Sequence, residues 1–167
     1  MFAVGDYILY GVEGVCRVEE VGYLNIPGID RTRQYYSLRP CYHEGAVYTP
    51  IDGKAAMRQV ITRQELDELM PSFPTLPLLD NVPPGAREAG VYYKNILTSH
   101  DCRMLFRLCK TISRKQSLLS PSRRNLSSTE LRSLRAAEEL LYGEIAFVLG
   151  LTPEAVRERM KELLENS

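Results

Sequence analysis

Polar and hydrophobic residues alternate with a period of two through much of the first sixty residues, which is typical of strands that bury one face. Residues 4–10, 15–24 and 56–61 are such runs. They are rich in β-branched and aromatic residues, and turn-forming residues separate them. Short strands at such close spacing predict a small, strongly bent β-sheet or barrel.

Residues 35–50 are the clearest pair of runs, two alternating segments around a polar turn at residues 43–45. They predict a hairpin in which Tyr36 and Leu38 share one face. Pro50 has no N–H for a ladder and is tolerated at a strand end or a sheet edge, so this run is a candidate to accept a strand from another protein. The alternative is that it pairs only within its own sheet. The candidate binding residues are Ala46, Val47, Tyr48, Thr49 and Pro50.

The pattern changes at Thr62, where Thr62 and Glu65 have the spacing of a capping box and predict a short helix to about Met70. Five prolines then lie between residues 71 and 85, too many for a regular helix or strand. The expected organisation is a β-domain over residues 1–70, a proline-rich linker over residues 71–85 and a helical domain over residues 86–167.

The helical domain is predicted to hold four helices. The first covers about residues 86–98, and Ser99 is expected to cap the second, with Asp101 in its first turn. A capping box at Ser127–Glu130 and a start at Thr152–Pro153 predict the other two. Together with the N-terminal strands, these helices predict an α+β protein with a helical bundle. The third helix is expected to pack one face into its core, namely Leu131, Leu134, Leu141, Ile145 and Val148.

The formal net charge is zero, but the charges are distributed unevenly. Residues 71–125 contain 9 Lys or Arg and 3 Asp or Glu, whereas acidic residues are in excess on both sides. Within the second helix, Arg103, Arg107, Lys110 and Arg114 follow the spacing i, i+4, i+7 and i+11, and the leucines lie on the other side. This spacing predicts a helix with one core face and one cationic stripe.

The cationic stripe is a candidate nucleic-acid surface, because phosphate contacts give salt-sensitive, sequence-independent affinity. No acidic residue occurs between Asp101 and Glu130, and Tyr92, Tyr93 and Asn95 add aromatic and amide groups. The alternative is an ordinary solvated helix face. The further cations that extend the stripe are Lys115, Arg123 and Arg124, and Lys94 lies just before it.

The sequence offers little for catalysis. His43 and His100 are its only histidines, and neither lies in a pattern that implies a nucleophile and its base, so surface roles are expected for both. No P-loop, GxGxxG or CxxC motif is present, and we expect no metal, no cofactor and no small-molecule substrate. No segment approaches the about 20 apolar residues of a membrane span, and no export signal is apparent, which favours the cytoplasm and four reduced cysteines.

Several segments, taken together, resemble the CarD/CdnL family of bacterial transcription regulators. The resemblance rests on residues 4–10 (VGDYILY), 14–16 (GVC), 35–40 (YYSLRP), 47–50 (VYTP), 99–101 (SHD) and 126–130 (LSSTE), together with Asn95. It spans nearly the whole chain, and the N-terminal part is shared with transcription-repair coupling factors.

This resemblance implies a Tudor-like β-domain that docks on the RNA polymerase β subunit by strand pairing through Tyr48, Thr49 and Pro50. It implies a helical domain that contacts promoter DNA near the upstream edge of the melted region, a role in open-complex stability and no enzymatic activity. The DNA-facing residues carried over by position are Tyr92, Tyr93, Lys94, Arg103, Arg107 and Arg132.

One departure from the family concerns an aromatic wedge. Well-studied members place a tryptophan just before the first helix of the C-terminal domain, whereas this chain has no tryptophan and Glu88 lies near the aligned position. A carboxylate beside phosphates does not replace lost base stacking. Tyr92 and Tyr93 are the aromatic candidates, with packing inside the bundle as the alternative for both.

The leading hypothesis is therefore a transcription regulator that RNA polymerase recruits, with weak, largely sequence-independent contacts to promoter DNA. Tethering raises the local DNA concentration, so these contacts do not need to be strong. The rival hypothesis is a protein–protein adaptor whose helical domain binds an acidic protein surface and not DNA.

Overall fold

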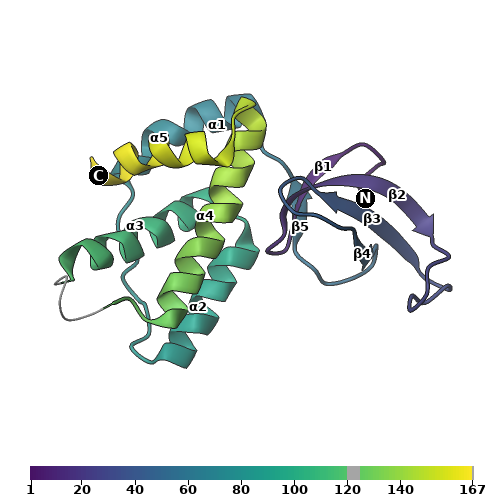
Figure 1. Cartoon of the computed structure of the whole chain (residues 1–167), viewed down its shortest axis with the longest axis horizontal. Coiled ribbons are helices and arrows are strands. Elements are labelled where there is room, and N and C mark those ends of the chain that lie inside the picture. Colours follow the sequence, from purple (N-terminus) through teal and green to yellow (C-terminus); the bar gives the residue numbers. More distant parts are fainter. Residues whose placement is uncertain (120–124, 167) are drawn as a thin grey trace. The chain divides into compact units, whose positions relative to one another are not determined.

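The computed structural model describes residues 1–119 and 125–166, which divide into two compact units, residues 1–60 and residues 61–167. The first unit consists of strands and the second of helices (Figure 1). The prediction of an α+β protein with an N-terminal sheet and a C-terminal helical region is confirmed.

The N-terminal unit is one antiparallel sheet with the strand order β4-β3-β2-β1-β5. The predicted hairpin at residues 35–50 is formed by β3 and β4, and the edges of the sheet are β4 and β5. The strands are β1 (Tyr7–Tyr10), β2 (Gly14–Tyr23), β3 (Gln34–Pro40), β4 (Val47–Pro50) and β5 (Met57–Gln59).

Alternation along the strands explains the small core of this unit. Tyr36 and Leu38 of β3 lie in it, as predicted, against Ile8, Cys16 and Val18. On the opposite face of β3, Tyr35 and Ser37 are also largely covered, whereas Arg39 is exposed. Arg39 is therefore a polar group on the outer face of the sheet.

The helical unit contains five α-helices and one 3-10 helix among the described residues. The predicted caps at Thr62 and Thr152 and the Ser127–Glu130 capping box are formed, and Gly150 ends α4 with φ +67°. The elements are α1 (Arg63–Leu69), η1 (Met70–Thr75), α2 (Ala86–Ser99), α3 (Cys102–Leu118), α4 (Ser128–Leu149) and α5 (Pro153–Glu165).

The start of α3 differs from the sequence-based expectation. Ser99 is the last residue of α2, and the N-cap of α3 is Asp101, whose carboxylate accepts hydrogen bonds from the N–H groups of Arg103 and Met104. His100 between them has φ +55° and is buried, so its predicted surface position was wrong. The left-handed turn at His100 ends α2, and the cap of α3 is the next residue, Asp101.

The proline-rich segment also differs from the expected linker. Leu66, Leu69, Phe73 and Leu79 all lie in the hydrophobic core of the helical unit. Phe73 is fully buried and stacks on Phe106 of α3, with ring centroids 4.5 Å apart. The compact units therefore divide between residues 60 and 61, and α1 with much of residues 71–85 packs with the helices.

One predicted core residue of α4 lies outside the core. Leu134, Leu141 and Ile145 are buried, but Leu131 is 40% exposed. The buried side of α4 includes Ala137, and Leu131 lies about 120° around the helix from it. Along the described part of the chain, no helix has the length and apolar character that crossing a bilayer requires.

Candidate protein and nucleic-acid interfaces

The β4 edge is open, because β4 pairs with β3 and forms the end of the sheet. In an antiparallel pair, residues that exchange backbone hydrogen bonds alternate with residues that do not. The Ile51 N–H donates to the Gln34 carbonyl at 3.0 Å, just beyond the β3–β4 ladder. Thr49 is two residues before Ile51, so its backbone N–H and C=O also point toward β3. The N–H and C=O of Tyr48, one residue before Thr49, therefore point outward.

The side chains of the five predicted edge residues are not equally accessible. Tyr48 is 40% exposed and Ala46 is exposed, whereas Thr49 is 3% exposed. Val47 and Pro50 are partly buried. Tyr48 and Ala46 thus offer side chains to a partner, and Thr49 holds the strand on the sheet.

A groove of about 460 Å³ lies beside this edge, and the sequence reasoning did not identify it. Arg39 and Glu19 are its charged lining residues, and the Glu19 carboxylate forms an ion pair of 2.7 Å with Arg17. In the sequence, the available indication of this groove was Arg39, a charged residue at a polar position near the end of an alternating run. The small side chains around the groove belong to Ser37, Gly45 and Ala46.

In the helical unit, residues 74–79, called the strap, cover part of the cationic stripe of α3. Lys110 is only 8% exposed, and its Nζ donates to the carbonyls of Leu76 at 2.6 Å and Pro74 at 3.4 Å. Arg107 donates to the carbonyls of Pro77 and Leu78. The expectation of a solvent-facing Lys110 was therefore wrong, because the strap lies over this part of the stripe.

The environment of Lys110 is unfavourable for a phosphate contact. Burial lowers the pKa of its ammonium group, and the positive charge of Arg114 lowers it further. Two carbonyl oxygens already accept hydrogen bonds from this group. Lys110 therefore acts as a link between α3 and the strap.

Lys115, predicted to extend the stripe, is also engaged. Its Nζ lies 2.6 Å from a carboxylate oxygen of Glu130, which also closes the capping box of α4 with Ser127. Burial raises the pKa of Glu130, but hydrogen bonds from Lys115 and Ser127 outweigh this and lower it overall. The ion pair therefore joins α3 to the start of α4.

The two aromatic candidates on α2 are packed to different degrees. Tyr93 is 3% exposed, and burial, with the charge of Glu130 and nearby Tyr92, raises its pKa. Tyr92 is partly buried against the same core, with its ring centroid 5.9 Å from that of Tyr93. Glu88 lies in the first turn of α2, where the helix dipole favours a carboxylate. Neither tyrosine projects freely as a wedge would.

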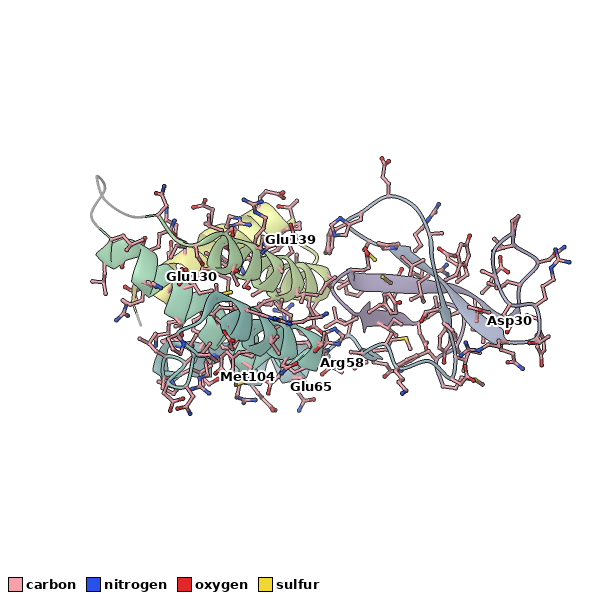
Figure 2. The ribbon with its side chains drawn as sticks, turned by 90° about the horizontal axis from the view of Figure 1, so that it is seen from below. Asp30, Arg58, Glu65, Met104, Glu130 and Glu139 are labelled. Carbon is pink, nitrogen blue, oxygen red and sulfur yellow. The ribbon has the colours of Figure 1, made fainter. Side chains whose placement is uncertain are left out.

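The remaining cations do not form one patch. Arg103 lies on the exposed side of α3, opposite the buried Ile112, and Arg132 lies two residues before the buried Leu134, on the exposed side of α4. The two side chains therefore belong to different helices, each on the side turned away from the core. In Figure 2, Met104 of α3 and Glu139 of α4 lie on opposite sides of the helical unit.

The exposed predicted residues fall into two groups. Arg103 and Arg114 belong to α3, and Lys94 and Arg132 belong to α2 and α4. Arg123 and Arg124 lie outside the described residues. The predicted cations are thus divided between α3 and the pair α2 and α4, which gives two alternative surfaces.

A buried polar junction at the start of the helical unit was also missed. Glu144 of α4 is fully buried and accepts hydrogen bonds from the Ile61 N–H at 2.9 Å and the Cys102 Sγ at 3.4 Å. The only indication of this junction in the sequence was Glu144 itself, an acidic residue on the apolar side of the helix. Within residues 1–119 and 125–166, no cluster of three or more His, Cys, Asp or Glu has the arrangement of a metal site.

Comparison with known proteins identifies the N-terminal unit. Residues 2–61 match the family model of the CarD-like/TRCF RID domain, which agrees with the resemblance to the CarD/CdnL family. This family is a non-enzymatic family of RNA polymerase-binding domains, and the domain indicates β-subunit binding and a role in transcription regulation. No curated protein sequence matches the chain significantly.

Proposed function

We propose that this protein is a transcription regulator that binds the RNA polymerase β subunit by adding a strand of that subunit to its β4 edge. The observation that carries the proposal is the open β4 edge within a CarD-like domain. The helical unit then contacts promoter DNA near the upstream edge of the melted region and changes the stability of the open complex.

Strand addition fits the edge because main-chain hydrogen bonds supply affinity and alternate side chains supply selectivity. The backbone N–H and C=O of Tyr48 point outward, and the exposed Tyr48 ring lies at the edge. Thr49 keeps β4 on β3 while a second strand pairs from the other side. The edge is therefore preformed.

The DNA contact rests on fewer cations than the sequence suggested. With Arg107, Lys110 and Lys115 bound within the protein, each of the two groups of exposed cations is small. A few phosphate contacts give weak, salt-sensitive affinity for free DNA. Recruitment by the polymerase compensates, because it makes the DNA contact effectively intramolecular.

The polymerase contact is tested by binding to a β-subunit fragment. Tyr48→Pro removes an outward N–H and leaves the β3–β4 ladder intact, so we expect affinity to fall at least about tenfold. Tyr48→Ala keeps the N–H and is the matched control for the lost ring. A folded Tyr48→Pro variant that binds as tightly as the native protein would remove strand addition from the proposal.

The DNA contact is tested by a promoter footprint with polymerase present. Arg103→Glu reverses a charge on α3, and Arg132→Glu reverses one on α4. We expect upstream protection to weaken for at least one variant, the one whose helix meets the duplex.

The adaptor remains the second candidate, because the internal contacts of Arg107 and Lys110 reduce the cations available for DNA. Under this alternative the helical unit binds an acidic protein surface. Unchanged upstream protection in both charge-reversal variants, with polymerase binding intact, supports the adaptor and contradicts DNA contact.

A further inference from the structure

The groove beside β4 lies on the same face of the sheet as the exposed edge side chains. Ser37 is paired with Tyr48, so these two residues share a face. Arg39 lies two residues from Ser37 along β3 and shares that face, and Ala46 lies just before β4. Ser37, Arg39 and Ala46 all line the groove, which therefore lies on the face of the sheet that carries Tyr48.

The two arginines on this face have different surroundings. Arg17 and Arg39 are paired across β2 and β3, and like charges directly opposite each other are unfavourable. Arg17 is neutralised by Glu19 at 2.7 Å. Within the described part of the chain, Arg39 forms no ion pair, and it is exposed. Glu20, paired with Ser37, is also exposed on this face, but it forms no ion pair with Arg39 in the described structure. The face therefore presents an arginine without an ion pair beside the open edge.

We propose that Arg39 binds an acidic side chain of the strand that pairs with β4, at the position on that strand that faces Ala46. This inference rests on the proposed function and specifies the chemistry of the partner strand. A partner with Asp or Glu at this position is selected over one with Lys or Arg.

The dimensions of a sheet permit this contact. Neighbouring strands are about 4.8 Å apart, so the partner strand lies two such spacings from β3. The methyl group of Ala46 leaves the space between them open, and an acidic side chain and the long Arg39 side chain meet above it. Glu19 also lines the groove, but its charge is compensated by Arg17.

Tyr48 has a separate role in this arrangement. It is paired with Ser37, which lines the groove, and its ring is 40% exposed on the same face. Partial exclusion of water by this ring strengthens a charge-assisted hydrogen bond between guanidinium and carboxylate.

The test measures binding of the full chain to the polymerase β-subunit fragment at several salt concentrations. We expect Arg39→Ala to weaken binding about tenfold at low salt, with a smaller difference at high salt because ions screen exposed charges. Arg39→Glu is expected to weaken it further. Arg31→Ala, which removes an exposed charge from a loop of the same unit, is the matched control and should bind like the native protein.

A charge exchange then identifies the acid. Each Asp and Glu on the edge strand of the fragment is changed to Lys, and one of these variants is expected to bind Arg39→Glu better than the native fragment does. Absence of any such rescue contradicts the inference.

The outcomes separate the two proposals. If Arg39→Ala binds like the native protein while Tyr48→Pro fails to bind, the acidic partner is wrong and strand addition stands. If the native protein does not bind the fragment, the proposed function fails and the inference fails with it.

Discussion

The β4 edge and the α3 stripe are two surfaces that periodicity predicted in the same way, yet only the edge remains fully open in the structure. β4 ends the sheet, and the outward backbone groups of Tyr48 have no neighbouring strand. On α3, by contrast, Arg107 and Lys110 bind the strap. An amphipathic pattern identifies the side of an element that avoids its own core, but it does not show whether another segment covers that side.

The physical difference lies in the range of the interactions. The hairpin forms between neighbouring runs, and the turn and Pro50 restrict how β4 continues. Lys110 has a long, flexible side chain, and it meets carbonyls 34 and 36 residues away in the sequence. Two substitutions test how firmly the strap and the segment before it belong to the helical unit, and a third tests the ion pair that engages Lys115.

The largest effect is expected at Phe73, the anchor of the segment that precedes the strap. Phe73→Ala leaves a cavity against Phe106, and we expect it to lower the free energy of unfolding of the helical unit by about 3–5 kcal/mol. Chemical denaturation monitored by helical circular dichroism measures this. Leu78→Ala, at a 38% exposed position, is the control with little change. Equal stability of both variants would mean that the segment is a loose linker.

A smaller effect is expected at Lys110. Lys110→Met keeps the aliphatic length but removes the two bonds to the strap, and we expect a loss of about 2 kcal/mol in the same measurement. Arg103→Met, seven residues earlier on the stripe and exposed, should change stability by less than about 0.5 kcal/mol. If both substitutions leave stability unchanged, Lys110 behaves as a surface cation, and its role as a link to the strap is wrong.

The smallest effect is expected at Glu130 and depends on pH. Its pKa is lower in the folded protein, so its carboxylate stabilises the fold above the pKa of the unfolded state, and this contribution disappears as pH falls through the folded value. Glu130→Gln should therefore lower stability by about 1 kcal/mol at pH 7 and have no effect at strongly acid pH. Denaturation curves at several pH values test this, with Glu139→Gln as the exposed control. A pH-independent difference would contradict it.

Much of the fold followed from local signals. The hairpin, the helix caps at Thr62 and Thr152 and the capping box at Ser127 formed where the sequence placed them, because each depends on residues close together in the chain. The errors at Ser99 and Leu131 concern which of several neighbouring residues caps the helix or faces the core. Such choices depend on how the helices meet, as the left-handed turn at His100 shows.

The candidate site divides in the same way. Alternation indicated that residues 46–50 form an edge strand, and the outward direction of Tyr48 follows from its place in the ladder. The groove at Arg39 needed the spatial meeting of β2, β3 and the 41–46 turn, which no single run of residues reveals. Likewise, the buried Glu144 bonds to the Ile61 N–H, 83 residues away, and to Cys102, 42 residues away.

The sequence by itself determined the strand and helix types, the hairpin and the CarD-like character of the first unit, because these depend on periodicity and on motifs within short stretches. Only the tertiary structure decided which charged groups remain available to a partner. Arg107 and Lys110 donate hydrogen bonds to the strap, Lys115 forms an ion pair with Glu130, and Arg39 remains exposed. The reason is that a long charged side chain binds whatever the fold brings within its reach, and the fold brings together residues that are distant in the sequence.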